Sequence, residues 1–269
     1  MTANLLQEFQ RVSKRVHCPI CEHPDWCLIR RDGERAICAR VESSHRWGEA
    51  GWLHVLAESV PVPARRPCRP PMNRDFGPLA DEYRHNIDIG RTMDLSAQLG
   101  VMTTSLTRLR VGWIPGVRAA SFPMQDETGK VVGIRLRYQD GRKLSCRGGH
   151  EGCFVPEGGL GDLSDVIVIC EGPTDTAAAL DAGADAIGRP SCTGGTTIIK
   201  ALLKGREAVI VADVDGPGVA GANRLAAELL TARIPSRIIQ PLNGKDLRQW
   251  HPTNAVLRIA IKCANYWNG

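Results

Sequence analysis

Three short runs rich in branched apolar residues constrain the fold of this chain most strongly. The runs are residues 166–170 (VIVIC), 208–212 (AVIVA) and 237–240 (RIIQ). Helical patterns at 176–182 and 219–231 separate them. Apolar strands that alternate with helices are typical of a parallel sheet covered on both faces. The sequence therefore predicts an α/β fold, a parallel sheet with flanking helices, for residues 163–269.

Two of these runs lead directly into acidic residues. Glu171 follows the first run, and Asp213 and Asp215 follow the second. If the two strands are neighbours, the three carboxylates face one another at the carboxyl edge of the sheet. Carboxylates that close need a cation, and Mg²⁺ or Mn²⁺ binds them while leaving positions for phosphate oxygens. We predict a metal-dependent phosphoryl-transfer site here, in which crowding raises the pKa of Glu171 and suits it to proton transfer.

The alternative for an acid after a strand is a helix N-cap or a turn residue, and Asp175 is interpreted in that way. The segments 171–175 (EGPTD) and 213–216 (DVDG) nevertheless resemble the TOPRIM signature shared by bacterial primases, topoisomerases and some nucleases. Residues 244–247 (GKDL) resemble the Lys-Asp segment of primase-like members. The resemblance implies that Asp246 is a further metal ligand and that Lys245 contacts nucleic acid or nucleotide.

Four of the ten cysteines lie close together near the start of the chain, which favours a metal over disulfides in a reducing cytosol. Cys18 and Cys21 have the spacing of a metal-binding knuckle. Strands are predicted at 26–31 and 34–40, and a two-residue turn between them places Cys27 opposite Cys38 on one face. These four residues are the predicted ligands of a structural Zn²⁺ ion. The open alternatives are His45 as fourth ligand, if the register slips by one residue, and buried free cysteines without metal.

The cysteine pattern resembles the zinc ribbon at the amino terminus of bacterial and phage primases. Residues 61–75 follow it and are rich in Pro and Arg, so we expect a linker there. Downstream, 79–109 has a helical pattern. Three alternating runs after it predict an antiparallel meander, with the runs at residues 121–124, 131–138 and 143–146.

This meander is strongly basic. In the second run Arg135 and Arg137 alternate with apolar residues, so a strand would present both guanidinium groups on one exposed face. A solvated charged face is the plain interpretation, and contact with a polyanion is the alternative. By resemblance to the basic subdomain of primases, this segment would bind template and nucleoside triphosphate through Arg135, Arg137, Lys143 and Arg147.

The predicted order is a zinc-ribbon domain at 1–60, a linker at 61–75, a basic subdomain at 76–162 and a TOPRIM catalytic domain at 163–269. This order resembles the primase architecture and implies synthesis of short primers on single-stranded DNA. Because no Walker A motif is present, a helicase would be a separate partner. No apolar run is long enough to span a membrane, so we expect a cytoplasmic protein. The alternatives are a metal-dependent nuclease and a non-catalytic DNA-binding module of replication or mobile elements.

Overall fold

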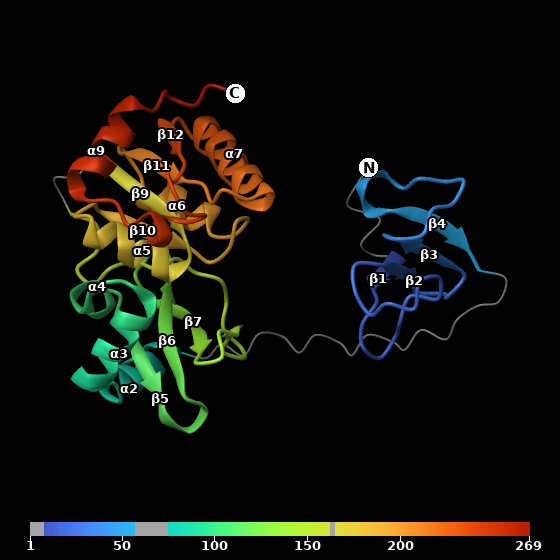
Figure 1. Ribbon diagram of the computed structural model, residues 1–269, viewed down its shortest axis with the longest axis horizontal. Helices are drawn as coiled ribbons and strands as arrows, with labels where there is room; N and C mark the ends of the chain where they lie inside the picture. Colours follow the sequence, from blue (N-terminus) through green and yellow to red (C-terminus); the bar gives the residue numbers. More distant parts are fainter. Residues whose placement is uncertain (1–7, 57–74, 162–164) are drawn as a thin grey trace. The chain divides into compact units, whose positions relative to one another are not determined.

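The computed structural model describes residues 8–56, 75–161 and 165–269. The chain divides into two compact units, Met1–Pro70 and Pro71–Gly269 (Figure 1). The predicted linker at 61–75 lies outside the described residues, apart from its last residue, Asp75. The predicted boundaries at 60 and 163 also fall there and stay predictions. None of the described helices combines the length and the apolar character that crossing a bilayer requires.

The first unit contains an antiparallel sheet with the strand order β1-β2-β3-β4. The strands are β1 Phe9–Arg11, β2 Leu28–Arg30, β3 Arg35–Cys38 and β4 Trp52–Val55, and a 3₁₀ helix spans Gly48–Ala50. β2 and β3 have the predicted register, with Leu28 opposite Ile37. Both strands are shorter than predicted at both ends, and at the turn the Gly33 N–H donates to the Arg30 carbonyl, which closes a longer turn.

The second unit begins with three helices and an antiparallel sheet. The helices are α2 Gly77–His85, α3 Ile89–Leu99 and α4 Thr103–Arg108. The strands are β5 Gly112–Ile114, β6 Ala119–Gln125, β7 Val131–Tyr138 and β8 Lys143–Ser145, with a 3₁₀ helix at Pro115–Val117. The predicted helical stretch is thus divided, and Gly100 ends α3 in the left-handed conformation, with φ of 67°. The meander has its predicted antiparallel pairing and gains β5 as an additional strand.

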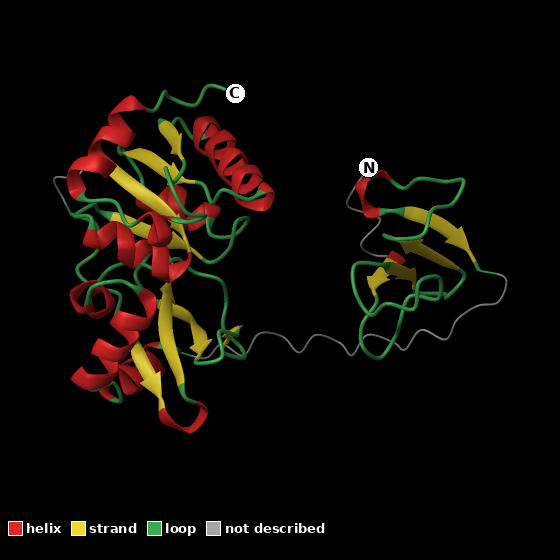
Figure 2. Cartoon of the chain, in the orientation of Figure 1, coloured by secondary structure: helices red, strands yellow, loops and turns green. Residues whose placement is uncertain are grey.

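A parallel sheet with the strand order β10-β9-β11-β12 follows. The strands are β9 Val166–Glu171, β10 Ala186–Arg189, β11 Glu207–Val211 and β12 Ser236–Ile239. The helices are α5 Gly172–Asp181, α6 Thr196–Leu202, α7 Gly216–Thr231, α8 Leu247–Trp250 and α9 Asn254–Cys263. Figure 2 shows these helices around the sheet, which confirms the predicted α/β fold. The two strands that lead into the acids, β9 and β11, are direct neighbours, with Ile169 opposite Ile210.

Alternate side chains of β9 point to opposite faces of the sheet and enter two different cores. Val168 belongs to the core made with α5, α8 and α9, whereas Ile167 belongs to the core made with α6 and α7. The first core continues into α3, α4 and β6. In addition, Phe154 and Gly188 exchange two backbone hydrogen bonds of 2.9 Å. The antiparallel and parallel sheets of the second unit are therefore packed against one another.

Candidate active site and metal centre

The positions of the carboxylates are determined by the ends of two neighbouring parallel strands. Glu171 is the last residue of β9, and Gly172 then begins α5 with φ of 81°, a conformation that favours glycine. Asp213 and Asp215 lie in the loop after β11, and the Asp215 side chain caps α7 through a 2.7 Å bond from the Gly218 N–H. The parallel pairing of β9 and β11 brings both acidic loops to the same edge of the sheet.

The loop before α8 brings a fourth acid to this edge. The Lys245 carbonyl accepts a 2.9 Å hydrogen bond from the Val214 N–H, which joins this loop to the one after β11. Asp246 is buried and caps α8 by accepting a 2.8 Å bond from the Gln249 N–H. The Lys245 side chain itself is exposed. This segment therefore adds the carboxylate of Asp246 to the acids at this edge. Lys245 acts mainly through its backbone carbonyl, which holds the two loops together.

Burial, followed by repulsion between neighbouring charges, raises the pKa of two of these carboxylates. Burial raises the pKa of Asp213 to about 7, and the charges of Asp175, Glu171, Asp246 and Asp215 act in the same direction. The pKa of Glu171 is also raised, chiefly by burial and in part by Asp215, while Arg189 opposes the shift. The crowding that the sequence predicts for Glu171 therefore adds to burial at both Glu171 and Asp213. Five carboxylates, not three, interact at this edge of the sheet.

Asp175 is the acid that the sequence interpretation assigned to a turn. It lies in the first turn of α5, is 7% exposed and accepts a 2.9 Å hydrogen bond from the Arg248 N–H. Burial raises its pKa to about 6, with a further contribution from Asp246. Asp175 therefore joins the acids at this edge of the sheet through a contact with α8 that no local sequence pattern indicates.

The carboxylates suit a divalent cation by their chemistry, although they are not closely gathered. Within the described ranges, the four cysteines are the only group of three or more His, Cys, Asp or Glu residues gathered closely enough to hold a metal ion as they stand. Hard oxygen ligands whose ionisation is opposed by their neighbours are the groups that Mg²⁺ or Mn²⁺ stabilises. The chemistry of these side chains therefore fits Mg²⁺ or Mn²⁺.

A small cationic pocket borders Glu171. Its volume is about 40 Å³, and it is lined by Phe122, Arg135, Arg137, Lys143, Glu171, Gly172, Pro173 and Thr174. Arg135 donates to the Pro190 carbonyl at 3.0 Å. The Nε atom of Arg137 is buried and has no hydrogen-bond partner among the described residues, and burial lowers the pKa of this group. Both arginines are half-buried and face the carboxylates, so they do not lie on the exposed face that the alternation predicted.

Two further arginines lie near this part of the chain, one exposed and one buried. Arg147 is exposed and does not line the cationic pocket. Arg189 is 4% exposed and donates to the carbonyls of Cys192, Gly194 and Gly221. Its guanidinium is hydrogen-bonded to the backbone and makes no ion pair with an acid in the described part of the chain, although its charge lowers the pKa of Glu171. No sequence pattern indicated this role.

The four predicted cysteines meet in the first unit. The Sγ atoms of Cys18, Cys21, Cys27 and Cys38 all lie within 4.8 Å of one another. Cys27 Sγ is 3.7 Å from Cys21 Sγ and 3.9 Å from Cys38 Sγ. A tetrahedral ion with Zn–S bonds of about 2.3 Å separates its ligands by about 3.8 Å, so the cluster fits Zn²⁺. His45 is exposed and is not part of the cluster.

Backbone and side-chain donors surround these sulfurs. Cys38 Sγ accepts from the N–H groups of Arg40 and Val41, at 3.5 and 3.2 Å. The Arg40 guanidinium lies 3.7 Å from Cys27 Sγ. Burial acts to raise the pKa of Cys21, but hydrogen bonds from the His23 N–H and from the other thiols outweigh it and lower the pKa to about 7. These donors favour the thiolate at Cys21, whereas burial raises the pKa of Cys18 and raises that of Cys27 to about 12, so a bound metal would be needed to hold those two as thiolates.

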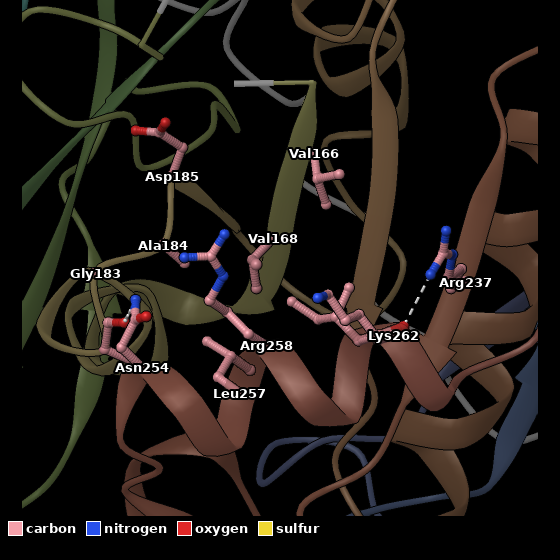
Figure 3. A pocket seen from close by; sticks show the side chains of 12 residues that line it. Val166, Val168, Gly183, Ala184, Asp185, Arg237, Asn254, Leu257, Arg258 and Lys262 are labelled. Atoms are coloured by element: carbon pink, nitrogen blue, oxygen red, sulfur yellow. Dashed lines mark hydrogen bonds between the residues drawn. The ribbon is translucent and has the colours of Figure 1, made fainter. Parts of the chain in front are cut away.

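Figure 3 shows a different hollow, of about 420 Å³, at the opposite end of the parallel strands. It lies between the start of β9, at Val166, and helix α9, from which Leu257, Arg258 and Lys262 line it. None of the predicted site residues lines this hollow. It is therefore separate from the carboxylate cluster.

No family model and no curated protein matches the chain. Several solved structures have the same fold. The Aquifex aeolicus primase, with its zinc-binding and RNA polymerase domains, is similar at a TM-score of 0.56 and 13% identity over 94% of this chain and 79% of that one. The E. coli primase catalytic core is similar at a TM-score of 0.55 and 14% identity, over 70% of this chain and 79% of that one.

A third similar structure is a DnaG primase catalytic domain bound to single-stranded DNA. It gives a TM-score of 0.55 and 15% identity over 70% of this chain and 77% of that one. The second unit thus has the fold of bacterial DnaG primase catalytic cores, and the cysteine cluster of the first unit fits a zinc ribbon. At these identities the likeness is one of fold.

Proposed function

We propose that this chain is a primase-like nucleotidyltransferase that joins nucleoside triphosphates into short primers on single-stranded DNA. The observation that supports this most is the position of the cationic pocket, directly beside Glu171 at the carboxylate edge. Phosphate oxygens need cations, whereas a metal ion needs carboxylates, and here the two kinds of group are adjacent. The DNA-bound primase of the same fold supports the same substrate class.

The carboxylates have separate roles in this proposal. Glu171, Asp213 and Asp215 would hold Mg²⁺ or Mn²⁺, with Asp246 as a further ligand. When bound, the metal supplies alignment of the attacking and leaving oxygens and neutralises the charge that develops on phosphate. The raised pKa of Glu171 suits it to accept the proton of the attacking hydroxyl. Asp175 would hold the loop before α8 in place through the Arg248 N–H.

The cationic residues would bind the polyanionic substrates. Arg135, Arg137 and Lys143 line the pocket at Glu171 and would neutralise phosphates of the triphosphate or the template strand. Arg147 and Lys245 are exposed and could contact only the strand outside this pocket. Contacts of this kind position a strand but do not read its sequence, so selection of a start site is assigned to the zinc-binding unit. A separate helicase would supply unwinding.

The experiment is an incubation of the protein with single-stranded template, labelled nucleoside triphosphates and Mn²⁺. A ladder of short primers is expected, and Asp213→Asn should abolish it. Asp94→Asn removes an exposed carboxylate of α3 and serves as the matched control, with wild-type synthesis expected. Template shortening would instead support a nuclease. The absence of both primers and shortened template would support a non-catalytic binding module. Primer synthesis by Asp213→Asn would contradict the site.

A further inference from the structure

A hollow of about 500 Å³ lies along the outer edge of the parallel sheet. β12 is the last strand of this sheet, and the segment after α9 runs beside it through a bridge between Tyr266 and Arg237. The hollow is lined by Ala212, which directly precedes Asp213, and by Gln240, which directly follows β12. It therefore reaches the same edge of the sheet as the carboxylates.

Two aromatic side chains of this hollow are held in fixed positions. The Trp267 indole N–H donates to Asn223 Oδ1 at 3.0 Å. The Tyr266 ring centre lies 4.2 Å from the guanidinium carbon of Arg237, and its hydroxyl donates to Glu207 at 2.7 Å. Both rings keep accessible surface, since Tyr266 is 52% exposed and Trp267 is half-buried. A ring that is already fixed loses little conformational freedom when a flat ligand stacks on it.

The remaining polar groups of the hollow are amides. Gln240, Asn265 and Asn268 line it, are exposed, and have no side-chain hydrogen-bond partner in the part of the chain that the structure describes. An amide offers donors and an acceptor together, as the edge of a nucleobase does. Among the described residues, no charged side chain lines this hollow. The chemistry therefore suits the uncharged, flat part of a nucleotide and not its phosphate.

We propose that this hollow binds an unpaired base of single-stranded nucleic acid, stacked on Trp267 and hydrogen-bonded by the surrounding amides. The inference rests on the proposed function, because it adds a base contact to the strand whose phosphates the cationic pocket would neutralise. Stacking accepts every base, since each has a flat π surface. Binding at this hollow releases no counterions, so it does not contribute to the salt dependence of affinity.

The test compares the affinity of wild type and Trp267→Leu for a labelled single-stranded oligonucleotide. EDTA is present and triphosphates are absent, so the result does not depend on catalysis. We expect binding to weaken by about 5- to 100-fold, the range for loss of one stacked base, with an unchanged slope of log affinity against log salt. Trp267→Phe keeps an aromatic ring and should keep most of the affinity. Ile259→Ala, at a 61% exposed position outside the hollow, should bind as wild type.

A strand with abasic positions supplies the second arm. Wild type should bind it at least as weakly as Trp267→Leu binds the normal strand, and Trp267→Leu should distinguish the two strands by a smaller factor than wild type does, because only the amide contacts remain. Wild-type affinity in Trp267→Leu, a loss accompanied by a smaller salt slope, or no binding of the strand by wild type would overturn the proposal. If Trp267→Leu shows no cooperative melting, the exposed double variant Gln240→Ala/Asn268→Ala replaces it, with a loss of about threefold or more expected.

The two proposals fail separately. Weakened binding in Trp267→Leu together with absent primer synthesis in wild type would contradict the proposed function alone. Suppose instead that wild type makes primers and that Trp267→Leu has the same template affinity and the same Michaelis constant for template as wild type. That result would contradict the base site alone.

Discussion

Asp213 has the most crowded environment of the acids at the sheet edge, because four other carboxylates raise its pKa together with burial. The sequence predicted most of this group, since each acid follows an apolar strand or belongs to a short motif. It did not predict the involvement of Asp175, which depends on how α8 packs against α5 and presents the Arg248 N–H to it. A contact between elements distant in sequence has no local signature.

In the absence of metal, we expect Asp213 to make the protein less stable as the pH rises from about 4 to about 7. Its pKa in the folded chain is about 7, against 3.8 ordinarily, so the folded state binds more protons than the unfolded state in this window. Stability is then lost as the pH rises through the folded pKa. The Asp213→Asn variant has no carboxyl group to ionise at this position. Its melting temperature in EDTA should therefore fall less than that of wild type over this pH range, by about 3 °C.

Thermal melts of both proteins at about pH 4 and about pH 7 make the comparison. Equal changes in the two proteins would show that Asp213 ionises with an ordinary pKa, which would contradict the crowding.

Arg137 provides a prediction about substrate binding. Its Nε is buried without a partner in the described residues, next to Glu171 in the cationic pocket. Arg137→Gln should raise the Michaelis constant for nucleoside triphosphate about tenfold or more, because it removes a charged hydrogen-bond donor. Arg142→Gln is the matched control: Arg142 is exposed and already paired with Asp140 at 2.6 Å. Equal Michaelis constants in the two variants would exclude a substrate contact at Arg137.

At the scale of elements, the β2–β3 hairpin determines the zinc site. Its register was predictable from Asp32 and Gly33, because counting from a turn fixes which side chains face each other. The length of the turn was not predictable, since a four-residue turn preserves the same pairing. The structure accordingly places Cys27 beside Cys38, and it leaves His45 outside the cluster.

The zinc assignment predicts different metal contents for two single variants. Cys27→Ser should lose the ion and lower the stability of the first unit, since a structural zinc contributes directly to folding free energy. His45→Asn should retain about one zinc per chain. Metal analysis of the purified proteins measures both. Zinc retained by Cys27→Ser and lost by His45→Asn would reverse the assignment of the fourth ligand.

Strand β10 shows the limit of pattern recognition for elements. Its four residues include Gly188 and Arg189, so it lacks the continuous apolar character of β9 and β11. Gly188 is required by packing: a Cβ there would lie 2.3 Å from Thr176 Oγ1. Arg189 can be buried because it donates to two backbone carbonyls of the loop after β10 and to one of α7. Both features depend on tertiary neighbours, which the sequence pattern does not contain.

At the scale of the whole molecule, the order of elements was predictable and their packing was not. Cysteine spacing, the basic meander and the apolar runs each have a local period or spacing that indicates one kind of unit. The shared core of the antiparallel and parallel sheets has no such signal, yet it places Arg135 and Arg137 beside Glu171. The combined site therefore depends on this packing as much as on either sheet.

The most direct test of the account is a titration of the zinc-loaded protein with Mn²⁺, followed by electron paramagnetic resonance of the free ion. Wild type should bind Mn²⁺ and make primers with the same Mn²⁺ dependence, because one site carries both properties. Asp213→Asn should lose this binding and primer synthesis together, whereas Asp94→Asn should retain both. Mn²⁺ binding and primer synthesis that persist in Asp213→Asn would contradict a metal-dependent site at the ends of β9 and β11.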